Sequence, residues 1–314
     1  MQPFPVTRIA HIQDRGDSPA WLVEGLWGDQ AVGFIGSYPK AGKTWLAIEL
    51  AVAVASGKPC LGRFPVPRPG PVLLYAAEDT AAAIRERTAA VARARGVNDI
   101  DRLAVGLITE PSLRLDAEEH QARLALTLAQ INPRLLVLDP LVRLHRADEN
   151  SASDVSSLLG FLRSLQREHQ VAVVLVHHIR KASASQPGQA LRGSGDLHAW
   201  SDSSLYLLRG RQRLELHAEH RAHPSPPPLH VELQASPSTH LHVVGELDNI
   251  CEGHDDEPIA QRIIDALKNQ PMNRGTLRQT LGVRNERLGH ALKDLEAIGR
   301  LKRVDGLLVP VPAS

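Results

Sequence analysis

Three features of this 314-residue sequence predict an α/β fold with a mostly parallel sheet flanked by helices, later antiparallel strands and a small second domain. Short, continuous apolar runs alternate with helical stretches from Ala31 to about Arg213, as in parallel strands that are covered on both faces. After residue 200, apolar and polar residues alternate within the runs, which is typical of antiparallel strands. An acidic segment, residues 249–257, then precedes a compact unit of about 58 residues, so we expect a second, small domain.

The first half of the predicted core consists of strand–helix units joined by right-handed crossovers. Continuous apolar runs predict strands at Ala31–Ile35, Val72–Tyr75, Leu103–Ile108, Leu135–Leu138 and Val171–Val176. Alanine-rich or amphipathic stretches between them predict helices at Thr44–Ser56, Thr80–Arg95, Ala117–Gln130 and Val155–Arg167.

The later part of the core is expected to be antiparallel. Alternating runs predict strands at Leu205–Leu208, Leu214–His217, Leu229–Leu233 and His240–Val244. The proline-rich residues 224–228 indicate a loop. The predicted organisation is an irregular lead-in (1–24), a core (25–248), an acidic linker (249–257) and a C-terminal domain (258–314).

Composition limits the classes of protein to which the chain can belong. Hydrophobic residues make up 43% and charged residues 23%, which is ordinary for a globular domain. The net charge of +1 excludes a uniformly basic coat for nucleic acid. No apolar run reaches the length of a membrane span, the first residues lack the apolar core of a signal peptide, and Cys60 and Cys251 are too few for a disulfide framework or a zinc site. We expect a cytoplasmic protein.

A phosphate-binding loop is predicted between the first strand and the first helix. Its residues are Gly36, Ser37, Tyr38, Pro39, Lys40, Ala41, Gly42, Lys43 and Thr44, followed by Trp45. Backbone N–H groups in such a loop surround phosphate oxygens at a helix N-terminus. Lys43 is expected to reach the β- and γ-phosphates of ATP and Thr44 to hold Mg²⁺. The spacing departs from the usual pattern, because Ser37 stands where glycine is expected and Gly36 comes one residue early.

Carboxylates follow two of the predicted strands. Asp139 ends the apolar run from Leu135, the position from which a carboxylate orients Mg²⁺ in P-loop enzymes. Glu78 and Asp79 follow the strand from Val72, which we expect beside the P-loop strand. Glu78 is the candidate catalytic base; the alternative is that both residues only cap the helix from Thr80.

Two histidines, His177 and His178, end the strand from Val171. At this edge of the sheet one of them, with His178 favoured, would lie near the γ-phosphate and respond to its loss. Because the chain has 15 histidines, an ordinary surface pair is the alternative.

Taken in order, these motifs resemble those of the RecA-like ATPases, in the branch of the plasmid replicative helicase RepA. The resemblance covers roughly residues 25–245, and it continues after the histidines with residues 192–195, Arg-Gly-Ser-Gly. It implies that Glu78 activates water, that His178 couples nucleotide state to DNA-binding loops, and that the protein forms hexameric rings.

The resemblance also implies basic loops that face DNA and an arginine finger supplied by a neighbouring subunit. Arg143, Arg146, Lys181 and Arg192 are the candidates for single-stranded DNA contacts, with ordinary solvated charge as the alternative. Asp202 stands at the position that matches the arginine finger of RepA, so the RepA finger has no counterpart at this position. By similarity to DnaB-type helicases Arg221 is the finger candidate, with Arg209 and Arg213 behind it.

The C-terminal unit is predicted to be a winged helix. Helical patterns at Pro258–Asn269, Gly275–Leu281 and Asn285–Ile298 precede alternating residues around Asp305 and Gly306, a hairpin signal. Arg284, directly before the third helix, and Arg287 and Lys293 within it lie on the face away from the core, where a recognition helix contacts duplex DNA. Winged helices that bind other proteins are the alternative.

These observations predict a Mg²⁺-dependent ATPase that acts on DNA, most simply a replicative helicase that moves along single strands. Two alternatives stay open: a repair or recombination ATPase without unwinding activity, and a nucleotide-gated regulator that binds duplex DNA.

Overall fold

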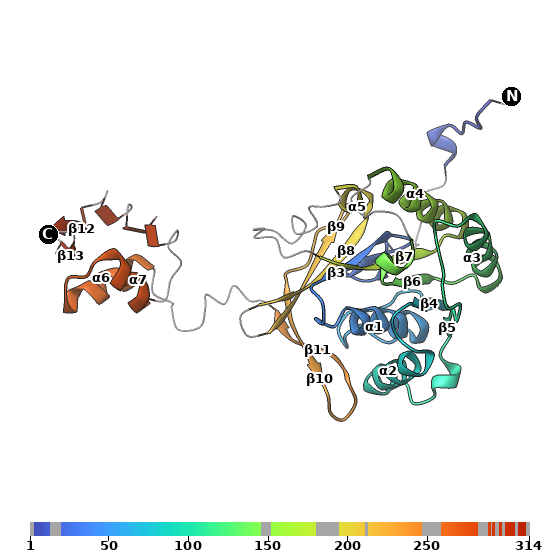
Figure 1. Cartoon of the computed structure of the whole chain (residues 1–314), viewed down its shortest axis with the longest axis horizontal. Coiled ribbons are helices and arrows are strands. Elements are labelled where there is room, and N and C mark those ends of the chain that lie inside the picture. The colour runs from blue at the N-terminus through green and yellow to red at the C-terminus, as the bar shows by residue number, and fades with distance from the viewer. Residues whose placement is uncertain are drawn as a thin grey trace. The chain divides into compact units, whose positions relative to one another are not determined.

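Two compact units, Met1–Leu247 and Asp248–Ser314, make up the chain in the computed structural model (Figure 1). Within the described part of the chain, none of the helices combines the length and apolar character that a bilayer crossing requires. The structure describes residues 3–12, 20–145, 152–179, 195–210, 213–246, 259–281, 288–289, 291–292, 295–296, 299–304 and 307–311.

A nine-stranded sheet in the order β11-β10-β9-β8-β3-β7-β6-β4-β5 forms the centre of the first unit. The strands from β8 to β5 in this order are parallel, and β9, β10 and β11 are antiparallel to their neighbours. The α/β prediction is therefore confirmed. The bounds are β3 Val32–Ser37, β4 Val72–Ala76, β5 Val105–Leu107, β6 Leu135–Asp139, β7 Ala172–His178, β8 Ser203–Arg209, β9 Leu214–His220, β10 Leu229–Gln234 and β11 His240–Glu246.

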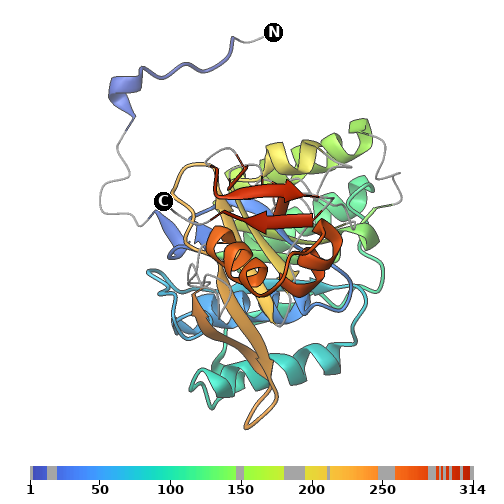
Figure 2. The ribbon, with the colours of Figure 1, turned by 90° about the vertical axis from the view of Figure 1, so that its left-hand side faces the viewer.

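Helices cover both faces of this sheet (Figures 1 and 2). On β6, Leu135 and Val137 belong to the core under α1 and α2, whereas Leu136 and Leu138 belong to the core under α3 and α4. Because side chains alternate between the faces of a strand, this double burial explains the continuous apolar runs. The helices are α1 Lys43–Ser56, α2 Ala81–Ala94, α3 Glu118–Ile131, α4 Ala152–His169 and the short α5 Gly195–Trp200, with 3₁₀ turns η1 Ile9–His11, η2 Ile100–Arg102 and η3 Leu141–Arg143.

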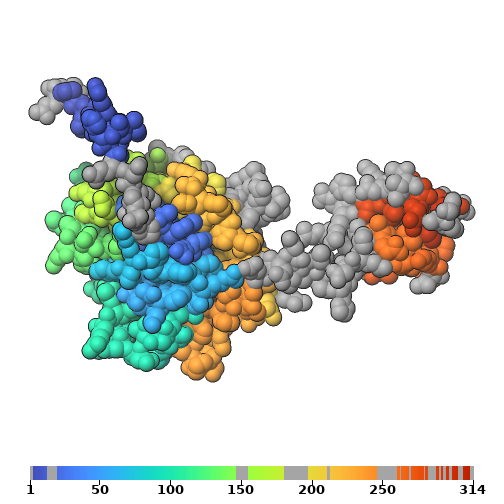
Figure 3. Space-filling model, turned by 180° about the vertical axis from the view of Figure 1, so that it is seen from behind, coloured from blue at the N-terminus to red at the C-terminus, as the bar shows by residue number. Residues whose placement is uncertain are grey.

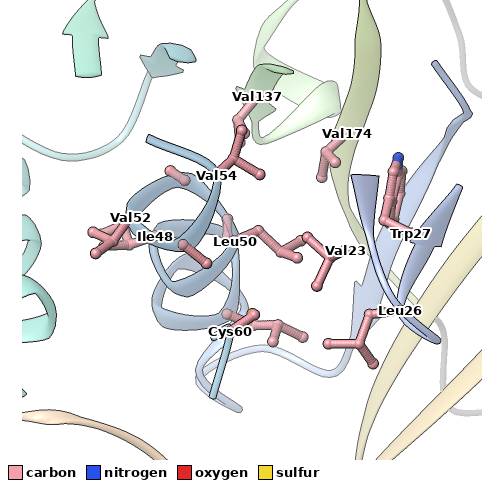
Figure 4. Packing of buried hydrophobic residues seen from close by; sticks show 14 of the residues in the cluster. Val23, Leu26, Trp27, Ile48, Leu50, Val52, Val54, Cys60, Val137 and Val174 are labelled. Carbon is pink, nitrogen blue, oxygen red and sulfur yellow. The ribbon is translucent and has the colours of Figure 1, made fainter. Parts of the chain in front are cut away.

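Part of the predicted lead-in belongs to the core. The strands β1 (Trp21–Val23) and β2 (Trp27–Gly28) pair with each other. Val23 and Trp27 are fully buried and lie against the α1 side of the sheet (Figure 4). The expectation that residues 1–24 are all irregular is thus wrong for β1, whose three residues are too few to give a periodic signal.

Close pairing between β3 and β8 gives the first testable prediction. A Cβ added at Gly33 would collide with the carbonyl oxygen of Ser203 on β8. We expect Gly33→Ala to lower the free energy of unfolding by about 3 kcal/mol, since main-chain atoms of two paired strands cannot move apart cheaply. The urea midpoint of unfolding measures this.

Gly160 is the matched control, because a Cβ added at this helical glycine meets no atom within 4 Å. We expect Gly160→Ala to leave the urea midpoint unchanged or to raise it, since alanine favours a helix by about 1 kcal/mol over glycine. A wild-type midpoint for Gly33→Ala would mean that β3 and β8 are not this close.

The second unit has a hydrophobic core of its own. It contains α6 (Ile259–Asn269) and α7 (Arg274–Leu281), and the described residues between 288 and 296 are helical. Leu288, Leu292 and Leu295 from that stretch are buried against residues of α6 and α7. The strands β12 (Leu301–Val304) and β13 (Leu307–Pro310) form an antiparallel pair whose register places Val304 opposite Leu307.

Candidate functional site

The predicted phosphate-binding loop connects β3 to α1. Lys40 and Gly42 have φ angles of 61° and 95°, the left-handed conformation that turns the chain sharply into the helix. Gly36 is packed so closely that a Cβ there would lie 3.1 Å from the side chain of Ile179. Ser37, which replaces the usual glycine, is fully buried and donates its hydroxyl to the carbonyl of Tyr38, 3.0 Å away. The serine is therefore accommodated inside the loop.

Lys43 points back into the loop from the first residue of α1. Its Nζ donates to the carbonyl of Tyr38 at 3.1 Å and lies 3.1 Å from Nδ1 of His178. Burial lowers the pKa of Lys43 below its usual value, and the carboxylates of Asp139 and Glu78 only partly oppose this shift. A cation held in this way at a helix N-terminus is suited to bind phosphate oxygens.

Thr44 and Asp139 come together beside Lys43. The Thr44 hydroxyl donates to Oδ2 of Asp139 at 2.7 Å. Burial raises the pKa of Asp139 to about 6, and the hydrogen bond from Thr44 opposes that shift. A hydroxyl and a carboxylate are the oxygen ligands that Mg²⁺ prefers next to nucleotide phosphates, so this pair fits a magnesium site.

Glu78 follows β4 and is half exposed. The expectation that β4 lies beside the P-loop strand is wrong, because β7 and β6 separate β4 from β3. Glu78 still lines the pocket, because β4 ends at Ala76, which pairs with Asp139 on β6, and Glu78 follows two residues later. The side chain of Thr80, rather than that of Glu78 or Asp79, caps α2 by accepting the N–H of Ala83 at 3.2 Å.

Arg143 makes an ion pair with Glu78. Its Nε donates to Oε1 of Glu78 at 2.8 Å, with the two side chains 62% and 47% exposed. Arg143 ends the η3 turn that follows Asp139 on β6. The candidate base is thus linked to the loop for which the resemblance implies DNA contacts.

The two histidines at the end of β7 lie on opposite sides of the sheet. In the parallel register His177 pairs with Gly36 and His178 with Ser37. Because side chains alternate, His178 shares the face of Val176, which belongs to the core under α1. His178 lines the same pocket as Lys43, and His177 is not among the lining residues.

These residues surround one pocket of about 690 Å³. Lys40, Ala41, Gly42, Lys43, Thr44, Trp45, Glu78, Asp79, Asp139 and His178 line the end that the sequence predicts. The remaining wall comes from α2 and from β8 to β11 with the residues that flank them, and includes Arg87, Arg209, Gly210, Arg213, Leu214, Leu233 and Leu241. Sequence reasoning missed most of this wall, because only the order of the strands brings β8 to β11 next to the P-loop.

Arg221 does not line this pocket. It follows β9 and forms an ion pair with Asp202, 3.3 Å away, next to the start of β8. Since β8 runs parallel to β3, this position lies at the edge of the sheet opposite the P-loop. Asp202 also accepts from the N–H of Val32 and from Arg163, so its role within the fold is structural. Arg209 and Arg213, in contrast, line the pocket of their own chain.

Six predicted DNA contacts fall outside the described residues. They are Arg146, Lys181, Arg192, Arg284, Arg287 and Lys293. Arg143 is the one member of the predicted set that the structure describes.

Comparison with known proteins identifies the fold. Among solved structures, a DnaB-like replicative helicase, studied with its interactions with primase, is similar over 66% of this chain, with 16% identity and a TM-score of 0.50. This chain spans 56% of that helicase chain, and the likeness establishes the RecA-like fold alone. The RadB recombinase matches 66% of this chain and 88% of its own, with 20% identity and a TM-score of 0.46.

A comparison with protein-family models identifies the family of the chain. The model described as an AAA domain matches residues 2–184, which include the P-loop, Glu78, Asp139 and both histidines. The match covers more than half of the 314 residues. The chain therefore belongs to the AAA domain family, as a P-loop ATPase with a RecA-like fold.

Proposed function

We propose that this chain couples Mg-ATP hydrolysis to movement along single-stranded DNA, as a replicative helicase of the RepA branch. The observation that carries the proposal is the convergence of Lys43, Thr44, Glu78, Asp139 and His178 on one pocket. The fold that the chain shares with a DnaB-like replicative helicase is compatible with DNA as the substrate.

Each of these residues has a distinct task in hydrolysis. Lys43 binds the β- and γ-phosphates and neutralises the charge that develops on them. Thr44 and Asp139 would hold Mg²⁺, which would supply positive charge to offset the negative charge of the phosphates. Glu78 accepts the proton of the attacking water. His178, 3.1 Å from Nζ of Lys43, responds to the γ-phosphate through that contact.

The Arg143–Glu78 ion pair supports a link between DNA and hydrolysis. While Arg143 donates to Glu78, one carboxylate oxygen is engaged by a guanidinium instead of a water molecule. The side chains of Arg143 and Glu78 are 62% and 47% exposed, so a phosphate of DNA can compete for Arg143. Binding of DNA would thereby free the catalytic base.

Arg143→Ala tests this link. We expect it to raise the ATPase rate without DNA by up to about fivefold, because an exposed ion pair is worth at most about 1 kcal/mol. Stimulation by single-stranded DNA should fall by a similar factor. Steady-state ATPase assays with and without an oligonucleotide measure both quantities.

Arg102→Ala is the matched control, since Arg102 is exposed and pairs with Asp99 away from the pocket. Its basal and stimulated rates should equal those of the wild type. A lower basal rate in Arg143→Ala, with stimulation intact, would contradict the proposed link.

We further propose that the protein acts as a hexameric ring in which Arg221 approaches the nucleotide of the neighbouring subunit. Arg221 is about half exposed, which is compatible with a contact in trans. Arg209 and Arg213 would then act on the nucleotide of their own subunit, whose pocket they line. The particle mass with and without Mg-ATP tests the ring.

For the second unit we propose a winged helix that binds duplex DNA. Its independent core, helical residues and two-stranded sheet are compatible with this fold. Residues 257–314 carry ten basic and six acidic side chains, so this part is basic within a nearly neutral chain. Arg284, Arg287 and Lys293 are the proposed contacts, and replacing any of them should reduce the salt dependence of duplex binding.

Strand displacement on a forked duplex distinguishes the proposal from its alternatives. A helicase separates the strands only with hydrolysable nucleotide, and Glu78→Gln abolishes the separation. A recombination ATPase hydrolyses ATP on single strands but displaces none. A regulator binds duplex sites tightly, in a sequence-dependent manner, even with Glu78→Gln.

A further inference from the structure

The β10–β11 hairpin, comprising β10, β11 and residues 235–239 between them, lies beside α1 and α2. Figure 3 shows its orange surface next to the cyan surface that includes α2. Ser238 in the connecting loop is buried and donates its hydroxyl to the carbonyl of Ala90 on α2 at 2.7 Å. The hairpin is therefore attached to the helical layer as well as to the sheet.

A buried ion pair makes the main attachment. Arg95, the C-cap residue of α2, donates to both carboxylate oxygens of Glu49 on α1 at 3.0 and 2.9 Å. The side chains are 8% and 0% exposed, so removal of either one leaves an uncompensated buried charge.

Both partners also bind the backbone of Leu241 on β11. Arg95 donates to its carbonyl at 2.6 Å, and Glu49 accepts its N–H at 3.0 Å. The pair thus fixes one residue of the hairpin from two directions.

Leu241 and its cross-strand partner Leu233 line the nucleotide pocket. Trp45 and Arg87 line the same pocket, in which Lys43, Thr44 and Asp139 belong to the P-loop and to the end of β6. The guanidinium of Arg87 lies 5.7 Å from the centre of the Trp45 ring, over its face. Leu233, Leu241, Trp45 and Arg87 therefore give the pocket aliphatic and flat, polarisable surfaces, which suit a nucleobase and ribose better than a phosphate.

We propose that the β10–β11 hairpin forms the wall against which the nucleoside of a bound nucleoside triphosphate packs, and that Glu49 and Arg95 are positioning residues for this wall. The proposal rests on the nucleotide binding proposed above. It assigns to the hairpin and to Arg95 a part in affinity for the nucleoside and none in contacts to the phosphates.

The test compares two ligands that share the phosphates and differ in the nucleoside: Mg-ATP and inorganic tripolyphosphate. Binding of both to the full chain is measured by calorimetry for the wild type, Arg95→Ala, Leu233→Ala and the double variant. We expect each single variant to weaken ATP binding about tenfold, a change of about 1.4 kcal/mol, and to leave tripolyphosphate binding unchanged. The double variant should be little weaker than Arg95→Ala, since both act on one wall.

Arg85→Ala is the control, because Arg85 lies on α2 in an exposed ion pair with Asp101 outside the pocket. It should bind both ligands as the wild type does. If Arg95→Ala fails to fold, Leu233→Ala decides alone, since Leu233 is 46% exposed and takes no side-chain part in the ion pair.

Parallel losses for both ligands in Leu233→Ala, or no loss for ATP, would overturn the inference while nucleotide binding by the P-loop stands. If the wild type binds neither ligand, the proposed function itself fails. The two failures are therefore distinguishable.

Discussion

Lys43→Ala is expected to reduce ATP turnover by about 10²-fold or more, the effect of removing one preorganised donor to a charged transition state. The lysine is 7% exposed, and its Nζ is held by the carbonyls of the P-loop and lies beside His178. Loss of the side chain removes both a phosphate contact and positive charge from the loop. Steady-state phosphate release measures turnover, and calorimetry measures the accompanying loss of ATP affinity.

Lys58→Ala is the matched control, because Lys58 is exposed just beyond the other end of α1. We expect its turnover to equal that of the wild type. Persistent turnover in Lys43→Ala would mean that the phosphate-binding loop is assigned incorrectly or that a contaminating ATPase is measured.

Glu78→Gln is expected to abolish hydrolysis and to retain ATP binding. A glutamine has the shape of glutamate but cannot accept the proton of the attacking water, and general-base catalysis contributes about 10²- to 10⁴-fold to rate. Glu78 lines the pocket without contacting Lys43 or Thr44 in any hydrogen bond of the described structure, so the phosphate end should be undisturbed. Single-turnover hydrolysis and equilibrium ATP binding separate the two effects.

Glu86→Gln on the exposed side of α2 is the control for the same chemical change and should be silent. If Glu78→Gln hydrolyses ATP at the wild-type rate, another group is the base. If it loses ATP binding instead, Glu78 serves the architecture of the pocket rather than the chemistry.

Local pattern was sufficient to predict most elements of the core. Strand β4 was expected at Val72–Tyr75 and extends from Val72 to Ala76, and α1 was expected at Thr44–Ser56 and begins at Lys43. Such predictions succeed because a strand buried on both faces needs a continuous apolar run. The phosphate end of the pocket follows from the same reasoning, because the carboxyl ends of parallel strands meet at one edge of a sheet.

The features that local sequence pattern did not predict depend on the order of the strands and on contacts between residues far apart in the sequence. No local signal indicates that β7 and β6 lie between β3 and β4, or that Arg143 reaches back to Glu78. The nucleoside wall was missed for the same reason, since Leu233 and Leu241 are ordinary strand residues until the strand order brings them to the P-loop. The N-cap of α2 is Thr80, which is a local feature of the sequence. Because Thr80 and not Glu78 is the capping residue, this favours a functional role for Glu78.

The ATPase rate of the full chain with Mg²⁺, measured with and without single-stranded DNA, tests the proposed coupling most directly. We expect measurable turnover that rises severalfold with DNA and disappears in Lys43→Ala. The rise would reflect release of Glu78 from Arg143, which lie 2.8 Å apart. A rate that is unchanged by single-stranded DNA across salt concentrations would refute coupling of hydrolysis to DNA, even if the pocket binds and hydrolyses ATP.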